Sequence, residues 1–257
     1  MDLGKQRIGL GNVGKRDIGN VSADRAGCFL QLQSGILMAE TKGSEFYPVA
    51  EQEGIIRFAY DLQAPETEIA EDELFRPLRA WRTIFRDLGL VGQDPARYHG
   101  LGFGNLSARD PARENEFIIT ASQSGGVEIL QQQQMVRIIN CNLDRFWVDA
   151  CGNQPPSSET LTHAMVYAAD PRITWIFHCH SPAIWGCASE LTLPCTDAAV
   201  GYGSQDMVRA VAELLQKHHS RPLVFATLGH TDGIFACGPT ARDTGGLLVS
   251  YLAKALT

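Results

Sequence analysis

Residues 155–180 read PPSSETLTHAMVYAADPRITWIFHCH, and this stretch decides how the second half of the chain folds. Ser157 or Ser158 can cap a helix, because a serine hydroxyl accepts a hydrogen bond from a backbone N–H of the first turn. Pro171 ends that helix, and the apolar run at 173–180 predicts a buried strand directly after it. A helix joined to a strand in this way indicates an α/β protein.

The region before this stretch predicts one helix and several strands. Alternating apolar residues at 56–62 indicate a strand with one buried face. Apolar residues from Leu74 to Leu88 recur at spacings of three and four, which predicts a helix with a single apolar stripe. Further strands are indicated by short runs of β-forming residues at 99–107, 116–121, 135–143 and 145–149.

The region after the stretch alternates helices and strands in the same way. Ser204 and Thr240 can each cap a helix, and the segments 223–228 and 233–236 are predicted strands. We therefore expect residues 46–257 to form one domain in which helices cover a mixed sheet.

Residues 1–45 differ from the rest, because they mix Gly, Asn, Ser and charged residues without a sustained period. They contain GLGNVG at 9–14, whose glycines match the pattern of a dinucleotide-binding turn. No apolar strand precedes this motif and no amphipathic helix follows it. We therefore predict a loosely ordered N-terminal extension in preference to a nicotinamide-binding site.

Composition excludes several classes of protein. The net charge of −7 and the pI near 5.5 argue against a nucleic-acid-binding face, which needs clustered Lys and Arg. No apolar run is long enough to span a membrane, so we expect no membrane partner. The seven cysteines include no CxxC pair, which favours reduced thiols and a cytoplasmic location.

Two histidines at the end of the predicted strand suggest a metal site. His178 and His180 are two residues apart, so their side chains share one face of the strand while Cys179 points to the other face. Two imidazoles placed in this way can bind one cation at about 2.0–2.1 Å if a third ligand arrives from elsewhere. The alternative is a pair of hydrogen-bonded histidines near a sheet edge.

Glu159 lies in the first turn of the helix that leads to the histidine strand. A carboxylate there can simply favour the positive end of the helix dipole. Beside a metal it can instead act as a general base, or as a ligand that moves away when substrate binds. His163, one turn later, could orient Glu159, although a core or surface role is favoured.

The third ligand is expected from the turn at residues 228–233, LGHTDG, which lies between two predicted strands. His230 is the first choice and Asp232 competes with it. Two histidines with one carboxylate would accept iron or manganese more readily than three histidines would. Alternatively, Asp232 and Gly233 form only a hairpin turn.

Three small polar clusters can line a pocket beside such a metal. They are GNLS at 104–107, SQSGG at 122–126, and the pair Ser157 and Ser158 at a helix start. Exposed backbone N–H groups, hydroxyls and a helix dipole can together hold an anion such as a sugar phosphate. Taken singly, each cluster is better explained as an ordinary turn.

Over about residues 69–257 the sequence resembles the class II aldolase/adducin family. The resemblance rests on four blocks in this order: GFGNLSAR at 102–109, ITASQSGG at 119–126, the stretch at 155–180, and LGHTDGIFACG at 228–238. It implies a three-layer α/β/α domain with a mixed, largely antiparallel sheet. It also implies a zinc ion bound by three histidines and a homotetramer.

Individual roles carry over only where this chain matches the family motifs. His178 and His180 match the paired zinc ligands, and Glu159 matches the acid/base glutamate, which can also touch zinc. The family usually places its third histidine immediately before the glycine, where this chain has Asp232, so His230 becomes the third ligand by a departure from the pattern. The positions that match the substrate-phosphate contacts are Asn105, Ser124, Gly125, Ser157 and Ser158.

The expected function is that of a metal-dependent, aldolase-type lyase. Its substrate would be a small, phosphorylated hydroxy-carbonyl compound that reacts through a metal-stabilised ene-diolate. An epimerase or a dehydratase could use the same site, and a non-enzymatic, adducin-like scaffold is the alternative from another class. Tyr202 is the nearest substitute for the tyrosine that some aldolases use as a proton donor.

Overall fold

The computed structural model of the protein describes residues 53–65 and 71–257, so the predicted extension at 1–45 and its glycine motif lie outside the described residues. The described chain is built on a nine-stranded sheet with the order β1-β7-β6-β5-β4-β8-β11-β10-β9. Two strand pairs, β1 with β7 and β10 with β9, are parallel, and the others are antiparallel. The strands are β1 (Ala59–Gln63), β4 (Asn105–Arg109), β5 (Phe117–Thr120), β6 (Met135–Asn142), β7 (Trp147–Gly152), β8 (Trp175–His180), β9 (Cys195–Thr196), β10 (Leu223–Thr227) and β11 (Gly233–Gly238).

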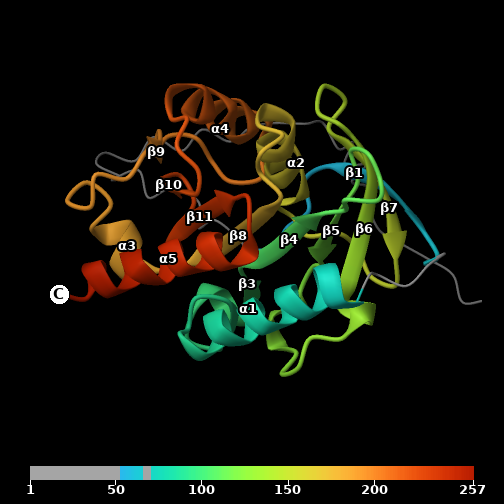
Figure 1. Cartoon of the computed structure of the whole chain (residues 1–257), viewed down its shortest axis with the longest axis horizontal. Coiled ribbons are helices and arrows are strands. Elements are labelled where there is room, and N and C mark those ends of the chain that lie inside the picture. The colour runs from blue at the N-terminus through green and yellow to red at the C-terminus, as the bar shows by residue number, and fades with distance from the viewer. Residues whose placement is uncertain (1–52, 66–70) are drawn as a thin grey trace, which may run out of the picture. The chain divides into compact units, whose positions relative to one another are not determined.

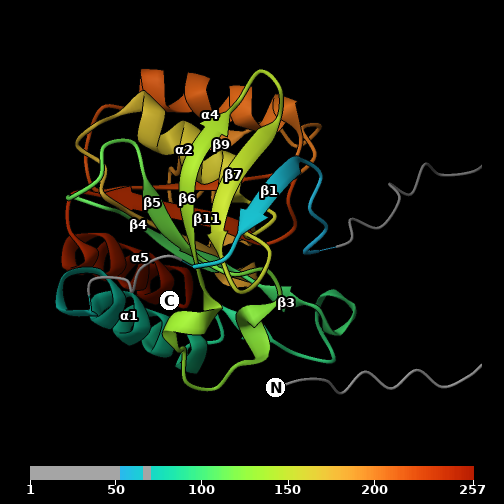
Figure 2. The same ribbon diagram turned by 90° about the vertical axis from the view of Figure 1, so that its right-hand side faces the viewer.

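Helices cover both faces of this sheet (Figures 1 and 2). On one face lie α2 (Thr160–Ala169) and α4 (Gln205–Lys217), and their apolar side chains pack with those of the sheet into one buried cluster. On the other face α1 (Arg76–Asp87) and α5 (Ala241–Ala255) complete a second cluster. The three-layer α/β/α fold with a mixed, largely antiparallel sheet is thereby confirmed.

Two of the predicted helix caps are present and one is displaced. The hydroxyls of Ser204 and Thr240 accept backbone hydrogen bonds at the starts of α4 and α5, as predicted. At α2 the cap position is Glu159 instead of a serine. The Ser157 carbonyl accepts from the Thr160 N–H and its hydroxyl accepts from the Glu159 N–H, so a turn precedes the helix and delays its start.

Some smaller elements were not predicted. The short helix α3 (Pro182–Gly186) directly follows β8, and the Ser181 hydroxyl caps it by accepting from the Ile184 N–H. The strand β2 (Gly92–Gln93), which was not predicted, and β3 (Gly102–Phe103), which lies within the predicted segment 99–107, form a separate antiparallel ribbon. The strand expected from residue 56 begins only at Ala59.

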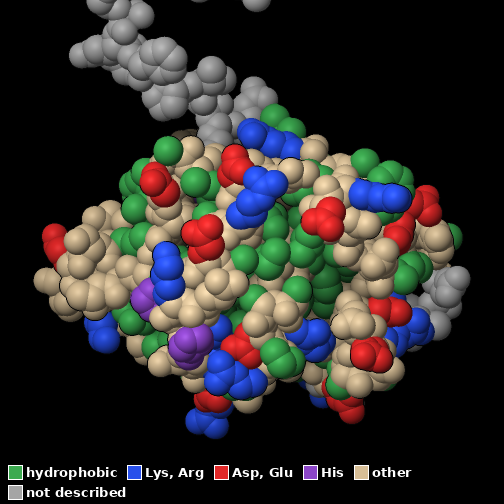
Figure 3. Space-filling view, turned by 90° about the horizontal axis from the view of Figure 1, so that it is seen from above, with side chains coloured by type: hydrophobic (Ala, Val, Ile, Leu, Met, Phe, Trp, Pro, Cys, Tyr) green, Lys and Arg blue, Asp and Glu red, His purple; other side chains and the backbone are tan. Residues whose placement is uncertain are grey.

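On the face seen in Figure 3, acidic and basic side chains are interspersed with apolar ones and do not gather into a basic patch. The six cysteines in the described ranges are free thiols. Within those ranges no helix is both long enough and apolar enough to cross a membrane.

Candidate metal centre and anion pocket

His178 and His180 lie on β8 in the interior of the sheet, between β4 and β11. In the strand register His178 is opposite Asn105 on one side and Phe235 on the other. Its ring stacks on Phe235 with centroids 4.2 Å apart, whereas Cys179 belongs to the core on the opposite face. Both histidines are fully buried, so the backbone of a central strand fixes where the two rings stand.

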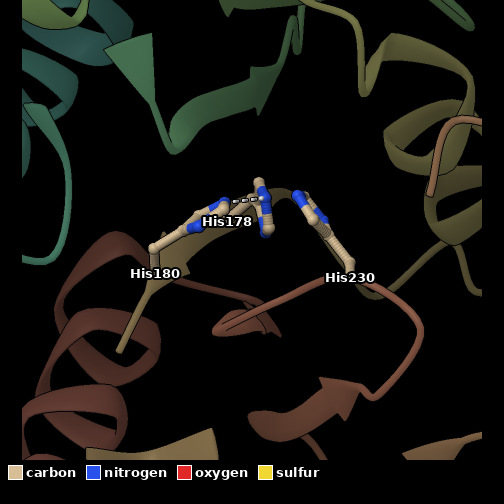
Figure 4. A group of neighbouring side chains, drawn as sticks. All are labelled: His178, His180 and His230. Carbon is tan, nitrogen blue, oxygen red and sulfur yellow. Dashed lines mark hydrogen bonds between the residues drawn. The ribbon is translucent and has the colours of Figure 1, made fainter. Parts of the chain in front are cut away.

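The two rings present their Nε2 atoms to each other at 3.2 Å (Figure 4). Two imidazoles bound to one tetrahedral zinc at about 2.0–2.1 Å place their nitrogens about 3.3 Å apart. His178 Nδ1 lies 3.2 Å from the Ile234 carbonyl, to which it can donate, and this leaves a lone pair on Nε2. The spacing therefore suits a shared cation.

Burial also keeps this pair in the form that binds metals. Desolvation, followed by the proximity of His230, holds the pKa of both His178 and His180 well below the usual value. Neutral imidazole is the ligating form, because a protonated ring has no free lone pair. The pair is thus uncharged at neutral pH.

His230 joins the pair from the turn between β10 and β11. The three histidines offer ligand atoms that all lie within 4.8 Å of one another, and each side chain is buried (Figure 4). Backbone hydrogen bonds from the His230 N–H to the Thr227 carbonyl and from the Gly233 N–H to the His230 carbonyl hold the turn. This tight turn brings His230, two positions before Asp232, over the strand pair.

Asp232, the competing third ligand, is not in this group of histidines. It adopts a left-handed backbone conformation with φ of 62°, and its Oδ2 accepts a hydrogen bond of 2.6 Å from the Tyr98 hydroxyl. Aspartate tolerates such a conformation at a turn better than most residues do. Its side chain therefore holds the turn to the segment that carries Tyr98.

Two carboxylates flank the His230 ring. Glu159 Oε1 lies 3.5 Å from His230 Nδ1, and Glu53 Oε2 lies 2.9 Å from His230 Nε2. The other oxygen of Glu53 is 3.7 Å from His180 Nε2. Glu159 and Glu53 are 1% and 8% exposed, so both charges sit inside the molecule next to the histidines.

His163 does not contact Glu159 in the way considered from the sequence. Its Nδ1 is 2.7 Å from the Ser107 hydroxyl, which is also 2.7 Å from the Tyr167 hydroxyl. Complete burial lowers the pKa of His163 to about 3. His163 is thus a neutral core residue that packs edge-on to Phe235, and this is the role that the sequence favoured.

The residues predicted to hold an anion line one small cavity of about 20 Å³. Its wall is formed by the turn after β5, the start of β4 and the turn before α2. The lining includes Asn105, Ser124, Gly125, Ser157 and Ser158. The Asn105 side-chain oxygen is buried without a hydrogen-bond partner in the described part of the chain, and Glu53 forms part of the same wall.

Arg82 holds the glycine-rich side of this cavity in place. Its guanidinium donates to the carbonyls of Ser124, Gly125 and Glu128 at 3.1, 2.9 and 3.1 Å. The turn is tight, because a Cβ added to Gly125 would lie 2.1 Å from the Gly92 carbonyl oxygen. Glycine at 125 is therefore required by the close approach of two backbone segments.

Three residues of the site were missed from the sequence: Glu53, Arg82 and Tyr98. Glu53 lies in a polar stretch with no periodicity. Arg82 lies in a helix whose periodic signal comes from the apolar residues beside it, so the sequence gives no sign of its role. Tyr98 belongs to a loop in which both it and His99 take positive φ values. Only tertiary packing brings these three side chains to the histidines and the cavity.

Tyr202 is fully buried, and its ring stacks on His230 with centroids 4.5 Å apart. Its hydroxyl donates to the Ile55 carbonyl at 3.0 Å. Desolvation and the neighbouring carboxylate of Glu159 raise the pKa of Tyr202 above its usual value. These contacts give Tyr202 a packing role beside the histidines.

Comparison with known proteins places this site in a family context. L-fuculose 1-phosphate aldolase has a similar fold, with a TM-score of 0.55, 18% identity, and coverage of 73% of this chain and 84% of that one. The enzyme of the same name from Thermus thermophilus has a TM-score of 0.52 and 18% identity, with coverage of 71% of this chain and 90% of that one. A sugar-phosphate aldolase from Thermotoga maritima has a TM-score of 0.52 and 15% identity, with coverage of 70% of this chain and 92% of that one.

At such low identity these structures establish the fold alone. A search of curated protein sequences found no match to the chain. The family model for the class II aldolase and adducin N-terminal domain matches residues 95–251, which is more than half of the chain and includes both histidine-bearing segments. The chain therefore belongs to the class II aldolase and adducin N-terminal domain family.

Proposed function

We propose that this protein is a metal-dependent, aldolase-type lyase that acts on a small, phosphorylated hydroxy-carbonyl compound. The observation that carries the proposal is the meeting of three buried histidines with the carboxylate of Glu159, 3.5 Å from His230. A polar cavity lined by two serine-containing turns lies beside them. Membership of the family supports an aldolase-like enzyme.

The metal would be held by His178, His180 and His230. Three imidazoles form a ligand set that suits zinc, and catalytic zinc sites commonly use three protein ligands. A cation bound there supplies a Lewis acid that stabilises the negative charge developing on the substrate's carbonyl and neighbouring hydroxyl oxygens.

Glu159 would move the proton. Its position at the start of α2 places the carboxylate near the positive end of the helix dipole, which stabilises the charged, proton-accepting form. Burial excludes water from the same carboxylate, so a proton taken from the substrate can be held at Glu159 and returned to the product.

The phosphate would enter the cavity beside Asn105, Ser124 and Ser157. At about 20 Å³ the cavity is only about large enough for one water molecule, so it must widen to accept a phosphate. The Gln123 side chain lines the cavity, and its oxygen accepts from the Gly102 N–H at 3.0 Å. Rotation of this flexible side chain is the simplest way to make room.

Epimerisation and dehydration remain alternative reactions of the same site, because each needs proton transfer beside a carbonyl group. A scaffold without activity is disfavoured, because such a protein has no chemical need to bury three histidines beside two carboxylates. We further propose a homotetrameric assembly, as the family resemblance implies, and a cytoplasmic location, which the lack of a CxxC pair among the cysteines favours.

Elemental analysis and an aldol-cleavage assay test the proposal together. We expect about one zinc per chain in the wild type and little in His180→Ala. Glu159→Gln should keep the metal and lose at least about a hundredfold in turnover, within the usual contribution of a general base. The substrate panel should include sugar 1-phosphates such as L-fuculose 1-phosphate, since an aldolase of that substrate shares the fold.

Glu190→Gln makes the same chemical change at an exposed position and serves as the control. Full zinc stoichiometry in His180→Ala would refute the metal site. Unchanged turnover in Glu159→Gln would refute the role of that residue as the base.

A further inference from the structure

Glu53 lines two hollows of the structure. One is the small polar cavity lined by Asn105 and the serines. The other is an open cleft of about 430 Å³ whose wall also includes Tyr98, His99 and His230. Because Glu53 lines both, the cleft and the predicted phosphate cavity approach each other at this residue.

The carboxylate of Glu53 spans two of the three proposed ligands. Its Oε2 is 2.9 Å from His230 Nε2 and its Oε1 is 3.7 Å from His180 Nε2. Donor atoms around one tetrahedral zinc lie about 3.3 Å from each other. The two measured distances belong to different oxygens of one carboxylate and fall on either side of that value, so the Glu53 carboxylate and these two nitrogens can bind the same cation.

The other carboxylate, Glu159, is on the opposite side of the His230 ring. It approaches Nδ1 at 3.5 Å, so a Nδ1–H there can point to Glu159 and leave a lone pair on Nε2. The same tautomer is set at His178, whose Nδ1 lies 3.2 Å from the Ile234 carbonyl. Nε2 of His230 therefore faces Glu53 as a ligating atom.

The chain segment that carries Glu53 is fixed to the body of the domain. The Ile55 carbonyl accepts from the buried Tyr202 hydroxyl at 3.0 Å, and the Arg57 guanidinium lies 5.2 Å from the centre of the Tyr202 ring. Tyr202 in turn stacks on His230. The position of Glu53 is thus tied to the histidine that it contacts.

We propose that Glu53 is a fourth protein ligand of the metal, which closes the site until substrate oxygens displace it. The inference rests on the proposed three-histidine metal site. Glu53 lies outside residues 95–251, the part of the chain that matches the family model, so that match does not include this ligand. Glu159, on the other side of the His230 ring, then remains the group that moves a proton.

Cobalt substitution combined with azide binding tests this assignment. Azide needs an open coordination position, and its binding changes the visible absorption of a protein-bound Co²⁺. We expect azide to leave the spectrum of the Co²⁺-loaded wild type unchanged and to produce a saturable change in Glu53→Ala and Glu53→Gln. Acetate added to Glu53→Ala should restore resistance to azide, because it returns a carboxylate to the vacated position.

Metal affinity provides a second readout. In competition with a chelator, Glu53→Gln should bind Co²⁺ at least about tenfold more weakly than the wild type, whereas Glu190→Gln should match the wild type. Loss of a residue that only orients His230 could also weaken binding. The azide response of the wild type, compared with that of Glu53→Gln, is therefore the deciding measurement.

The outcomes separate this inference from the proposed function. An azide response in the wild type as large as that of Glu53→Gln would overturn the role of Glu53 as a ligand, while loss of Co²⁺ in His180→Ala would leave the three-histidine site standing. A wild type that takes up no Co²⁺ would overturn both.

Discussion

Replacing Arg82 by methionine should destabilise the protein and loosen the anion cavity. The side chain is 3% exposed and donates to three carbonyls of the turn after β5. In Arg82→Met the Ser124 carbonyl still accepts from the Val127 N–H, and the Glu128 carbonyl still accepts from Arg86 at 2.8 Å. The Gly125 carbonyl loses the guanidinium donor altogether.

The magnitude follows from these contacts. The partly buried Gly125 carbonyl, left without its donor, costs about 1–3 kcal/mol, and each of the two weakened charge-assisted bonds costs about 1 kcal/mol more. Burying methionine in place of a desolvated guanidinium offsets part of this, so we expect a net loss of about 2–4 kcal/mol. For a chain of this length that corresponds to a fall in Tm of roughly 5–15 °C.

Thermal and urea unfolding measure the effect. Arg86→Met is the matched control, because it removes one exposed hydrogen bond from the same helix and should cost no more than about 0.5–1 kcal/mol. Arg82→Met should also raise KM for a phosphorylated substrate without changing the metal content. If Arg82→Met and Arg86→Met melted within about 2 °C of each other, the reasoning would be refuted.

Two other predictions concern a buried histidine and a pair of glycines. The pKa of His163 is lowered to about 3 in the folded protein, so below pH about 6.5 the unfolded chain binds a proton at His163 that the folded chain does not. The free energy of unfolding therefore decreases as the pH is lowered. Between pH 7.5 and 5.5 the wild type should lose about 1.4 kcal/mol more unfolding free energy than His163→Gln in urea titrations, and equal losses would contradict this. In α5, Gly246→Ala should stabilise by about 0.5–1 kcal/mol, since a Cβ there meets no atom within 4 Å. Gly245→Ala should instead cost about 1–3 kcal/mol, because its Cβ would lie 2.4 Å from the Trp81 ring; equal melting temperatures for the two variants would count against this.

Much of the fold could be predicted because local periodicity and tertiary packing agree. The helix over Leu74–Leu88 corresponds to α1 and the short helical turn before it, and the strands β5, β6, β10 and β11 lie within a residue or two of the predicted segments. The order of strands in the sheet could not be predicted, because it depends on pairings between distant segments such as β1 with β7. The helix α3 is too short to produce a recognisable period.

In the site, too, residues marked by a local pattern could be predicted, whereas residues brought in by tertiary packing could not. His178 and His180 could be identified together because the alternation of a strand places both on one face, and the structure has them 3.2 Å apart. The choice between His230 and Asp232 depends on how a short turn directs each side chain, and the sequence leaves that open. Glu53 could not be found at all, since it lies far from His178 in the sequence and no motif includes it.

The backbone holds the histidine ligands more firmly than it holds Glu53, and this difference determines how the metal would exchange. His178 and His180 belong to a strand with hydrogen-bonded neighbours on both sides, and His230 is held by a closed turn, whereas Glu53 depends on a short segment fixed to Tyr202. Removing a cation with a chelator would therefore leave the imidazoles where they are, with no secondary structure to rebuild. Uptake and release of the metal then require only movement of the Glu53 side chain, so metal reloading should be fast and should not require refolding.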